Sequence, residues 1–249
     1  MSDLKGYLSE FTRYEDAAGT KDLSRIYPDF KNHHEAFNFI LSFGDGKFKS
    51  DPEAIQLAIG LNPTIAFQLI KKGPSKAGGD YSVIDVVESR HILLLSYLKT
   101  HMGNKPLGNV LEIGGGYGNF FRLASEIFEY ESWTIADLEF ITKLQKWFLE
   151  QEKVVMDRVT LMPSTHLVDL MPDLVIGTHS LSEFDLDTFT SYYNRYIKKA
   201  KRLLYSSHNT MPSRELLERK METILTDFVI ASSKKYELHQ STMYIFEKK

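Results

Sequence analysis

The chain has 249 residues, of which 43% are hydrophobic and 25% charged, and its formal net charge is -3. These proportions are those of an ordinary globular protein that can bury a core without disulfide or metal staples. The sequence holds no cysteine, which excludes disulfide scaffolds, Cys-ligated zinc, iron–sulfur clusters and thiol nucleophiles. Because nucleic-acid phosphates bind to basic faces, the slightly acidic balance argues against a nucleic-acid partner.

The sequence shows neither a signal peptide nor a membrane span. Its N-terminus alternates charged and aromatic residues and lacks the apolar core of about 7–15 residues that secretion signals carry. The longest apolar runs, such as Ile92–Leu95, fall far short of the ~20 residues that cross a bilayer. We therefore expect a cytoplasmic protein without a membrane span.

Residues 1–104 are predicted to form a helical region, because their apolar residues recur at helical spacing with almost no strand alternation. The clearest helix is predicted to run from Ser82 to Met102. Its apolar stripe consists of Ile84, Val87, His91, Leu94, Leu95, Leu98 and Met102. Glu88 and Arg90 lie off that stripe, so Arg90 is expected to point to solvent or to a site.

From residue 105 to 249 short apolar runs alternate with amphipathic helices, which is the pattern of a parallel sheet with helices on both faces. Strands are predicted at 109–113, 132–136, 159–162, 173–177 and 202–206, and helices near 119–130, 139–152, 186–200 and 216–225. Two last runs, 228–232 and 242–247, are predicted to form an antiparallel hairpin. We expect a mostly parallel, seven-stranded sheet of the α/β class.

A glycine-rich turn at residues 114–118 joins the first predicted strand to a helix. Glycine permits positive φ there and lets a ligand approach backbone N–H groups at the helix N-terminus. The dinucleotide pattern G-x-G-x-x-G fails because position 119 is asparagine, and the Gly-Lys-Ser/Thr of a phosphate-binding loop is absent. The pattern that fits is E-x-G-x-G-x-G, formed by Glu112, Gly114, Gly116 and Gly118.

This pattern resembles the first motif of class I S-adenosylmethionine-dependent methyltransferases, which have a Rossmann-like sheet. The resemblance implies S-adenosyl-L-methionine as cofactor, with its methionine part held by backbone groups near Gly114, Gly115 and Gly116. Glu112 belongs to the same motif. A carboxylate inside a covered strand is costly unless it meets donors, and an exposed strand end is the alternative.

Asp137 ends the second predicted strand, 19 residues after Gly118. Its two oxygens are expected to accept from the ribose hydroxyls of the cofactor, and the alternative role is an N-cap of the next helix. After the third strand the family places an acidic or polar residue near adenine, and this sequence has Ser164. Ser164 is a candidate adenine contact, with Met162 or Leu138 packing on the face of the ring, while a plain β-turn explains the segment equally well.

The fourth predicted strand ends in THSLSEF, residues 178–184. Together with ESRHILLLSYL, LEIGGGYG and IADL, this segment resembles a bacterial group of sugar O-methyltransferases over roughly residues 80–210. The resemblance implies an acceptor sugar lying against this loop. Since ligands of open α/β sheets bind at the carboxyl ends of the strands, the loop is well placed for that role.

A sugar hydroxyl needs a base to withdraw its proton, and His179 is the candidate because an unperturbed imidazole has a pKa of about 6.5. Glu183 is expected to orient the imidazole or to bind sugar hydroxyls. His208, at the end of the fifth strand, is a rival base, and a structural histidine is the alternative for His179. His179, Glu183, Asp185 and Asp187 could together hold a magnesium ion, and the alternative is that the two aspartates cap the next helix. No metal is predicted.

The helix before the first strand borders the methionine end of the cofactor in this family. Tyr81 or Arg90 is therefore a candidate to close over the cofactor or to pair with its carboxylate, and a solvent-exposed Arg90 is the alternative. Residues 1–104 are expected to act as an acceptor-binding cap over residues 105–249.

The predicted function is an S-adenosylmethionine-dependent O-methyltransferase that acts on a sugar hydroxyl of a glycan or a nucleotide sugar. Methylation of another small hydroxylated or amine acceptor, and a non-catalytic protein that binds the cofactor, are the alternatives. A nicotinamide dehydrogenase is disfavoured by Asn119. The sequence leaves open whether the protein forms a homodimer.

Overall fold

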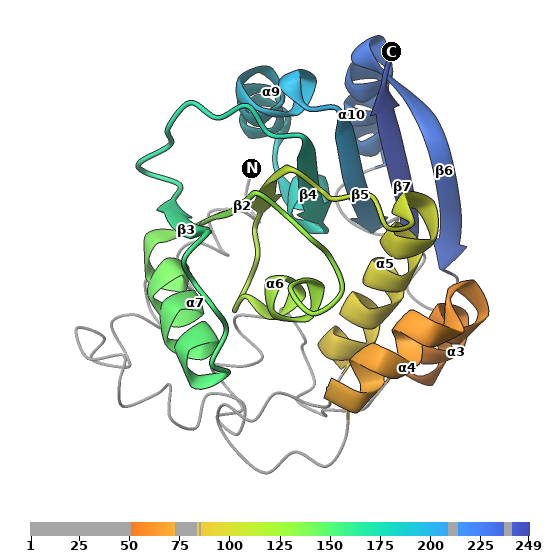
Figure 1. Cartoon of the computed structure of the whole chain (residues 1–249). Coiled ribbons are helices and arrows are strands. Elements are labelled where there is room, and N and C mark those ends of the chain that lie inside the picture. The colour runs from red at the N-terminus through yellow and green to blue at the C-terminus, as the bar shows by residue number, and fades with distance from the viewer. Residues whose placement is uncertain (1–50, 73–83, 85, 209–213, 237–240) are drawn as a thin grey trace.

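In this computed structural model, residues 51–72, 84, 86–208, 214–236 and 241–249 are described, and all structural statements refer to them. Their seven strands form one sheet in the order β3-β2-β1-β4-β5-β7-β6 (Figure 1). The strands are β1(Asn109–Ile113), β2(Ser132–Asp137), β3(Val159–Pro163), β4(Leu174–Thr178), β5(Arg202–His208), β6(Phe228–Tyr236) and β7(Ser241–Lys248). β1 to β5 are parallel, and β7 is antiparallel to both β5 and β6. This confirms the predicted fold class.

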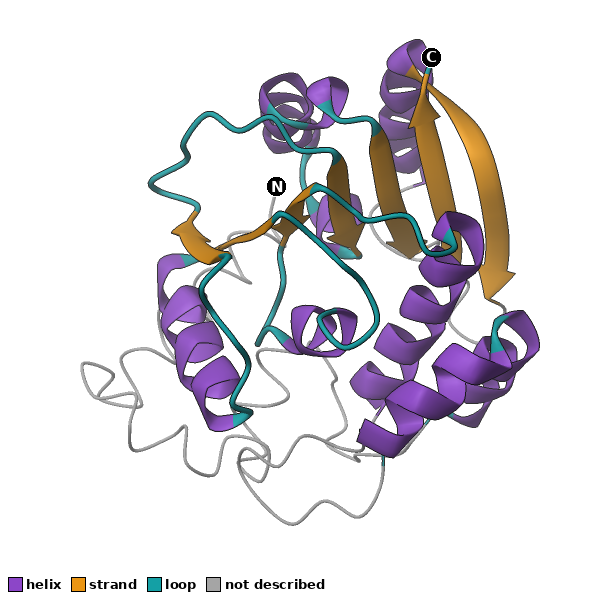
Figure 2. Ribbon diagram, viewed as in Figure 1, coloured by secondary structure: helices purple, strands orange, loops and turns teal. Residues whose placement is uncertain are grey.

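Helices cover both faces of the sheet (Figure 2). One face packs against α5(Val86–Met102), α6(Asn119–Ala124) and α7(Glu139–Gln151). The other packs against α9(Leu186–Arg195), the 3-10 helix η3(Ile197–Lys199) and α10(Arg214–Asp227), with the short α8(Ser180–Glu183) at the end of β4. Because strands β1, β2 and β4 are covered on both sides, most of their residues are buried, including the polar Glu112 and Thr134.

The helix predicted at 119–130 is shorter than expected, because α6 ends at Ala124. The hydroxyl of Ser125 donates to the carbonyl of Arg122 at 2.8 Å and so competes for an acceptor that the next helical turn would use. Phe128 nevertheless stays buried, which explains why the apolar spacing continued past the end of the helix. Apolar periodicity therefore marked the buried face correctly and the helix end wrongly.

Two further helices, α3(Pro52–Leu61) and α4(Pro63–Lys72), pack on α5 on the side away from the sheet (Figure 1). Their apolar residues belong to the same core cluster as those of β1 and β2. As a result α5 is buried on almost every side from Val87 to Leu98. Glu88 and Arg90, which lie off the apolar stripe, are therefore buried as well, at only 1% and 9% exposure, and Arg90 does not point to solvent. The stripe on α5 could not reveal the helices that cover its second face.

The buried charges between α5, α6 and α7 meet at Arg122 on α6. Its guanidinium donates to Glu88 Oε1 at 3.2 Å and to Asn119 Oδ1 at 2.7 Å, and it lies 3.5 Å from Glu152 Oε2. All three ionic side chains are less than a tenth exposed. Arg122 thus supplies a positive charge to two buried carboxylates.

No helix in the described part of the chain combines the length and the apolar composition that a bilayer span requires.

Replacing Arg122 with methionine should lower the free energy of unfolding by about 3–5 kcal/mol, because Glu88 and Glu152 lose their buried counter-charge. Urea denaturation followed by circular dichroism measures the change. The control is Lys143→Met, whose side chain is 61% exposed in its pair with Glu139 and whose loss should cost no more than about 0.5 kcal/mol. Equal effects of the two substitutions would show that the buried network contributes nothing beyond a surface ion pair.

Candidate active site at the carboxyl edge of the sheet

The ends of β1 and β4 approach each other closely at the carboxyl edge. Gly114, just after β1, has φ +72, and a Cβ there would lie 2.3 Å from the Cβ of Ser180. The Ser180 hydroxyl donates to the carbonyl of Ile113. Only glycine fits at position 114, for reasons of both conformation and space.

The rest of the glycine loop turns outward beyond this contact. Gly116 has φ +54, and a Cβ built on it would meet nothing within 4 Å, so open space lies directly above its backbone. Gly115 differs, because a Cβ there would lie 2.5 Å from Ile135 and 3.1 Å from Glu112 Oε1. The loop thus presses its middle residue onto the sheet and exposes the backbone of the next one.

Asp137 holds the exposed part of the loop. Its Oδ2 accepts the backbone N–H of Gly116 at 3.0 Å and its Oδ1 that of Leu138 at 2.8 Å. Gln145 on α7 donates to the carbonyl of Gly116 at 2.8 Å and to Asp137 Oδ2 at 3.3 Å. The N-cap of α7 is Leu138, so Asp137 does not serve as the helix cap that was its alternative role. Burial raises the pKa of Asp137 to about 7, against the effect of these donors.

Glu112 lies beneath the glycine loop and is completely buried, so the alternative of an exposed strand end is wrong. Its Oε2 accepts the indole N–H of Trp133 at 2.9 Å, whereas Oε1 has no hydrogen-bond partner among the described residues. Burial raises the pKa of Glu112 to about 8, and the nearby Asp137 adds to the shift. Burial thus raises the pKa of two carboxyl groups that lie on the same face of the sheet, since Glu112 pairs with Ile135, two residues before Asp137.

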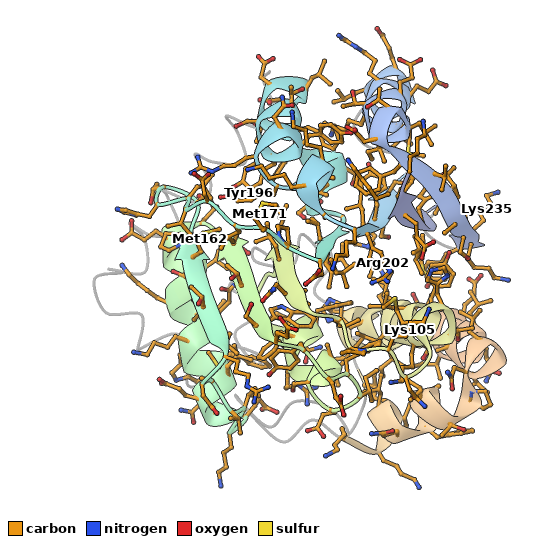
Figure 3. The ribbon with its side chains drawn as sticks, turned by 45° about the horizontal axis from the view of Figure 1, so that its top comes forward. Lys105, Met162, Met171, Tyr196, Arg202 and Lys235 are labelled. Carbon is orange, nitrogen blue, oxygen red and sulfur yellow. The ribbon has the colours of Figure 1, made fainter. Side chains whose placement is uncertain are left out.

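Ser164 lies beside Asp137, since its backbone N–H donates to the carbonyl of Asp137 at 2.7 Å. The loop that it opens is tied down further along, where Tyr196 donates to the carbonyl of Val168 at 2.7 Å. Figure 3 shows Tyr196 beside the part of this loop that carries Met171, whose side chain is 71% exposed. Ser164 and Leu138 thus flank Asp137, as an adenine site next to a ribose site requires, and their cofactor role stays a prediction.

His179 has φ 75, a value that non-glycine residues rarely adopt, and it immediately precedes α8. Its backbone N–H donates to the carbonyl of Ser206 on β5 at 3.1 Å. Its half-buried side chain lines a cavity of about 10 Å³ together with Arg90, Tyr236 and Met243, among others. His179 is thus held in a strained conformation at the carboxyl edge, facing α5 and the closing hairpin.

Three other predicted site residues, Glu183, His208 and Arg90, have described backbones, and they lie in different elements around His179. Glu183 ends α8, and its backbone N–H donates to the carbonyl of His179 at 3.2 Å. His208 ends β5 opposite Ser241, but its side chain, like Tyr81, lies outside the described residues. Arg90 reaches Asp51, with 3.8 Å between Nε and Oδ2, and burial lowers its pKa. The alternative of a solvent-exposed Arg90 is therefore wrong; Arg90 lines the cavity beside His179, and its pairing with the cofactor carboxylate stays a prediction.

Asp185 acts as the N-cap of α9, where its Oδ1 accepts the backbone N–H of Thr188 at 2.7 Å. Within the described residues, no three His, Asp or Glu side chains are grouped so that they could hold a metal ion. The capping role weighed against a magnesium site is the one that Asp185 performs.

The sequence analysis missed three residues that shape the site: Ser180, Gln145 and Lys220. Ser180 and Gln145 contact the glycine loop from elements distant in the chain, and neither stands out in the sequence. Lys220 carried a signal, because it follows Leu217 by three residues and precedes Ile224 by four, on the apolar face of α10. A lysine at such a position is unusual unless its charge is satisfied.

No protein-family model and no curated protein sequence matches the chain. Among solved structures, the N-methyltransferase NodS from Bradyrhizobium japonicum WM9, in complex with S-adenosyl-L-homocysteine, matches with a TM-score of 0.51 and 13% identity, over 80% of this chain and 99% of its own. The PH0226 protein from Pyrococcus horikoshii OT3 matches with a TM-score of 0.50 and 16% identity, over 68% of this chain and 95% of its own. The methyltransferase domain of bacterial CtHen1-C matches with a TM-score of 0.50 and 13% identity, over 64% of this chain and 96% of its own. This chain has a Rossmann-like fold, which it shares with PH0226 and with the methyltransferases NodS and CtHen1-C.

Gly114→Ala should destabilise the protein more than Gly116→Ala. Both substitutions force alanine into positive φ, at about 1–2 kcal/mol each, but only the first places a methyl group against Ser180, which adds about 1–3 kcal/mol. Chemical denaturation measures both. The double variant Gly114→Ala/Ser180→Gly should recover the difference, and a double variant no more stable than Gly114→Ala would contradict the steric explanation.

Glu112→Gln should make the protein more stable at pH 8 and less sensitive to pH between about 5 and 8. Because the folded state raises the pKa of Glu112 to about 8, it binds a proton there that the unfolded chain has lost, and stability falls as the pH rises. Glutamine keeps an acceptor for Trp133 and carries no charge. Denaturation at a series of pH values tests this, with the exposed Glu129→Gln as control. If the free energies of unfolding of wild type and Glu112→Gln changed in parallel with pH, the raised pKa of Glu112 would be contradicted.

Proposed function

We propose that the protein is an S-adenosylmethionine-dependent methyltransferase that transfers a methyl group to a sugar hydroxyl, in a glycan or a nucleotide sugar. The observation that carries the proposal is the open space above the backbone of Gly116, bordered by Asp137, in a fold shared with methyltransferases. The E-x-G-x-G-x-G pattern has a geometric reason at its first two positions, with Glu112 buried beneath the loop and Gly114 fitted against Ser180.

The residues at this edge fit the proposed cofactor. The backbone of Gly114 to Gly116 would hold its amino-acid part, Asp137 its ribose, and Ser164 with Leu138 its adenine. A carboxylate has about four acceptor positions, and donors from Gly116, Leu138 and Gln145 use three of those on Asp137. One position remains on Oδ1, so Asp137 can accept one ribose hydroxyl at once and a second only by releasing a loop contact.

When bound, S-adenosyl-L-methionine supplies a methyl group on a sulfonium, which is open to in-line attack. In the proposed mechanism, His179 accepts the proton of the acceptor hydroxyl as that oxygen becomes the nucleophile. Glu183 binds the acceptor or orients His179, and His208 is the alternative base. The close contact of Ser180 with Gly114 fixes the base-bearing loop against the cofactor loop, so that the reacting groups are held in one geometry.

The sugar as acceptor rests on the match of THSLSEF and three other segments to sugar O-methyltransferases. A second candidate acceptor is an amine-bearing small molecule. It is favoured by the similarity to NodS, an N-methyltransferase that matches over 99% of its own length. The two candidates differ in the proton that must be removed, since a neutral amine attacks without prior deprotonation. His179 is needed for the first acceptor and dispensable for the second.

The test uses cofactor labelled on its methyl group, incubated with a panel of nucleotide sugars, glycans and small amines. The proposal expects label in a sugar. Asp137→Ala should abolish cofactor binding in calorimetry, and His179→Ala should keep that affinity while turnover falls by about 100-fold or more. Unchanged cofactor affinity in Asp137→Ala would overturn the cofactor site. Label in amines alone would transfer the assignment to the second candidate, and binding without transfer to any acceptor would indicate a non-catalytic protein.

A further inference from the structure

Lys220 on α10 is a fully buried lysine whose charge points at the backbone of the loop that carries His179. Its Nζ donates to the carbonyls of Leu181 at 3.0 Å and Ser182 at 2.8 Å, and also to that of Phe184. These three carbonyls lie at the end of α8, where the last carbonyls of a helix lack partners within the helix. An ammonium group has three N–H donors, so the three acceptors use its whole capacity.

The surroundings of Lys220 compensate only part of the free-energy cost of burying its charge. Burial lowers the pKa of Lys220 to about 8, while Glu183 and Asp185 oppose the shift and the ring of Phe189 lies 5.6 Å from Nζ. Glu183 is exposed, and Asp185 is committed to capping α9. The fold therefore carries a cation whose desolvation its neighbours offset only in part. The burial of α10 alone gives no reason for a lysine, because its neighbours on that face are Leu217, Met221 and Ile224.

We infer that Lys220 is a positioning residue, which holds α8, and through it His179 and Ser180, in the arrangement that methyl transfer requires. This inference rests on the proposed function. Lys220 does not touch the reacting groups. It binds the far end of a segment whose beginning carries the proposed base, and the segment is only four helical residues long.

The segment between β4 and α9 is tied to three separate elements. Ser180 bonds to the carbonyl of Ile113 at the end of β1, and the N–H of His179 bonds to Ser206 on β5. The Ser182 hydroxyl donates back to the carbonyl of His179 at 2.5 Å. Lys220 supplies the tie to α10. Because φ 75 at His179 is strained, these outside contacts must hold it, and a missing one lets the backbone relax.

Lys220→Met tests the inference, because methionine keeps the length and apolar stem of the side chain and removes its three donors. We expect the melting temperature to stay within ~5 °C of wild type, since the lost contacts and the removed desolvation act in opposite directions. Hydrogen exchange of residues 180–184 should become faster, while the strands keep their protection. Cofactor affinity should be unchanged and kcat should fall by about 100-fold, as for a displaced catalytic group.

Lys220→Arg, which keeps a cation with several donors, should restore part of the exchange protection and of kcat. Arg219→Met, an exposed neighbour on the same helix, is the control and should change neither. Lys220→Met with wild-type exchange at 180–184 and wild-type kcat would overturn the inference while leaving the proposed function intact. If Lys220→Met does not fold, Lys220→Arg is the test. Slow exchange at 180–184 together with a low kcat in Lys220→Arg would show that turnover does not depend on the order of this loop, and would overturn the inference.

The exchange measurement also separates this inference from the proposed function. Should the wild-type protein transfer no methyl group to any acceptor, the proposed function fails, and faster exchange in Lys220→Met would still establish the hold on α8. In that case the role of Lys220 in turnover is overturned together with the proposed function.

Discussion

The contact between the ends of β1 and β4 is the constraint on which the site depends. The two strands pair in parallel, with Glu112 opposite Ile176, so the chain leaves both at the same edge and both loops need the same space. The conflict is resolved by a residue without a side chain at 114 and a small one at 180, whose hydroxyl then bonds to the carbonyl of Ile113. From this contact the glycine loop turns outward toward Asp137, and the loop after β4 turns into α8.

Three ionisable side chains with shifted pKa values lie around these two loops. Glu112 and Asp137 lie beneath and beside the glycine loop with raised pKa values, and Lys220 lies beneath α8 with a lowered one. In each case burial disfavours the ionised form, and hydrogen bonds or opposite charges offset only part of that effect. A fold selected for stability alone would do better with apolar side chains at such positions. Groups whose pKa values are shifted by burial are often found at functional sites, so their position beside these two loops makes them candidates for a functional role.

Much of the sheet could be predicted because its signals are local. Strand β1 begins and ends as expected, and β4 is displaced by one residue, because parallel strands covered on both faces read as short apolar runs. Asp137 and the glycine loop were found for the same reason, since position at a strand end is visible in the sequence. Contacts between distant segments left no such trace. Arg90 lies beside Asp51 at the start of α3, and the N–H of His179 bonds to Ser206 on β5, and neither contact is visible in the sequence.

The cavity beside His179 also depends on contacts between distant segments, here between the first described helix and the closing hairpin. Asp51 begins α3, where its Oδ1 accepts the N–H of Ala54 at 3.1 Å, and its Oδ2 accepts the hydroxyl of Tyr236 at the end of β6. Arg90 approaches the same Oδ2, and both Arg90 and Tyr236 line the cavity that His179 faces. One carboxylate thus joins the first described helix, α5 and the closing hairpin at the proposed base. The helices α3 and α5 therefore share with the closing hairpin both an apolar core and the polar contacts around Asp51, and these contacts lie beside His179.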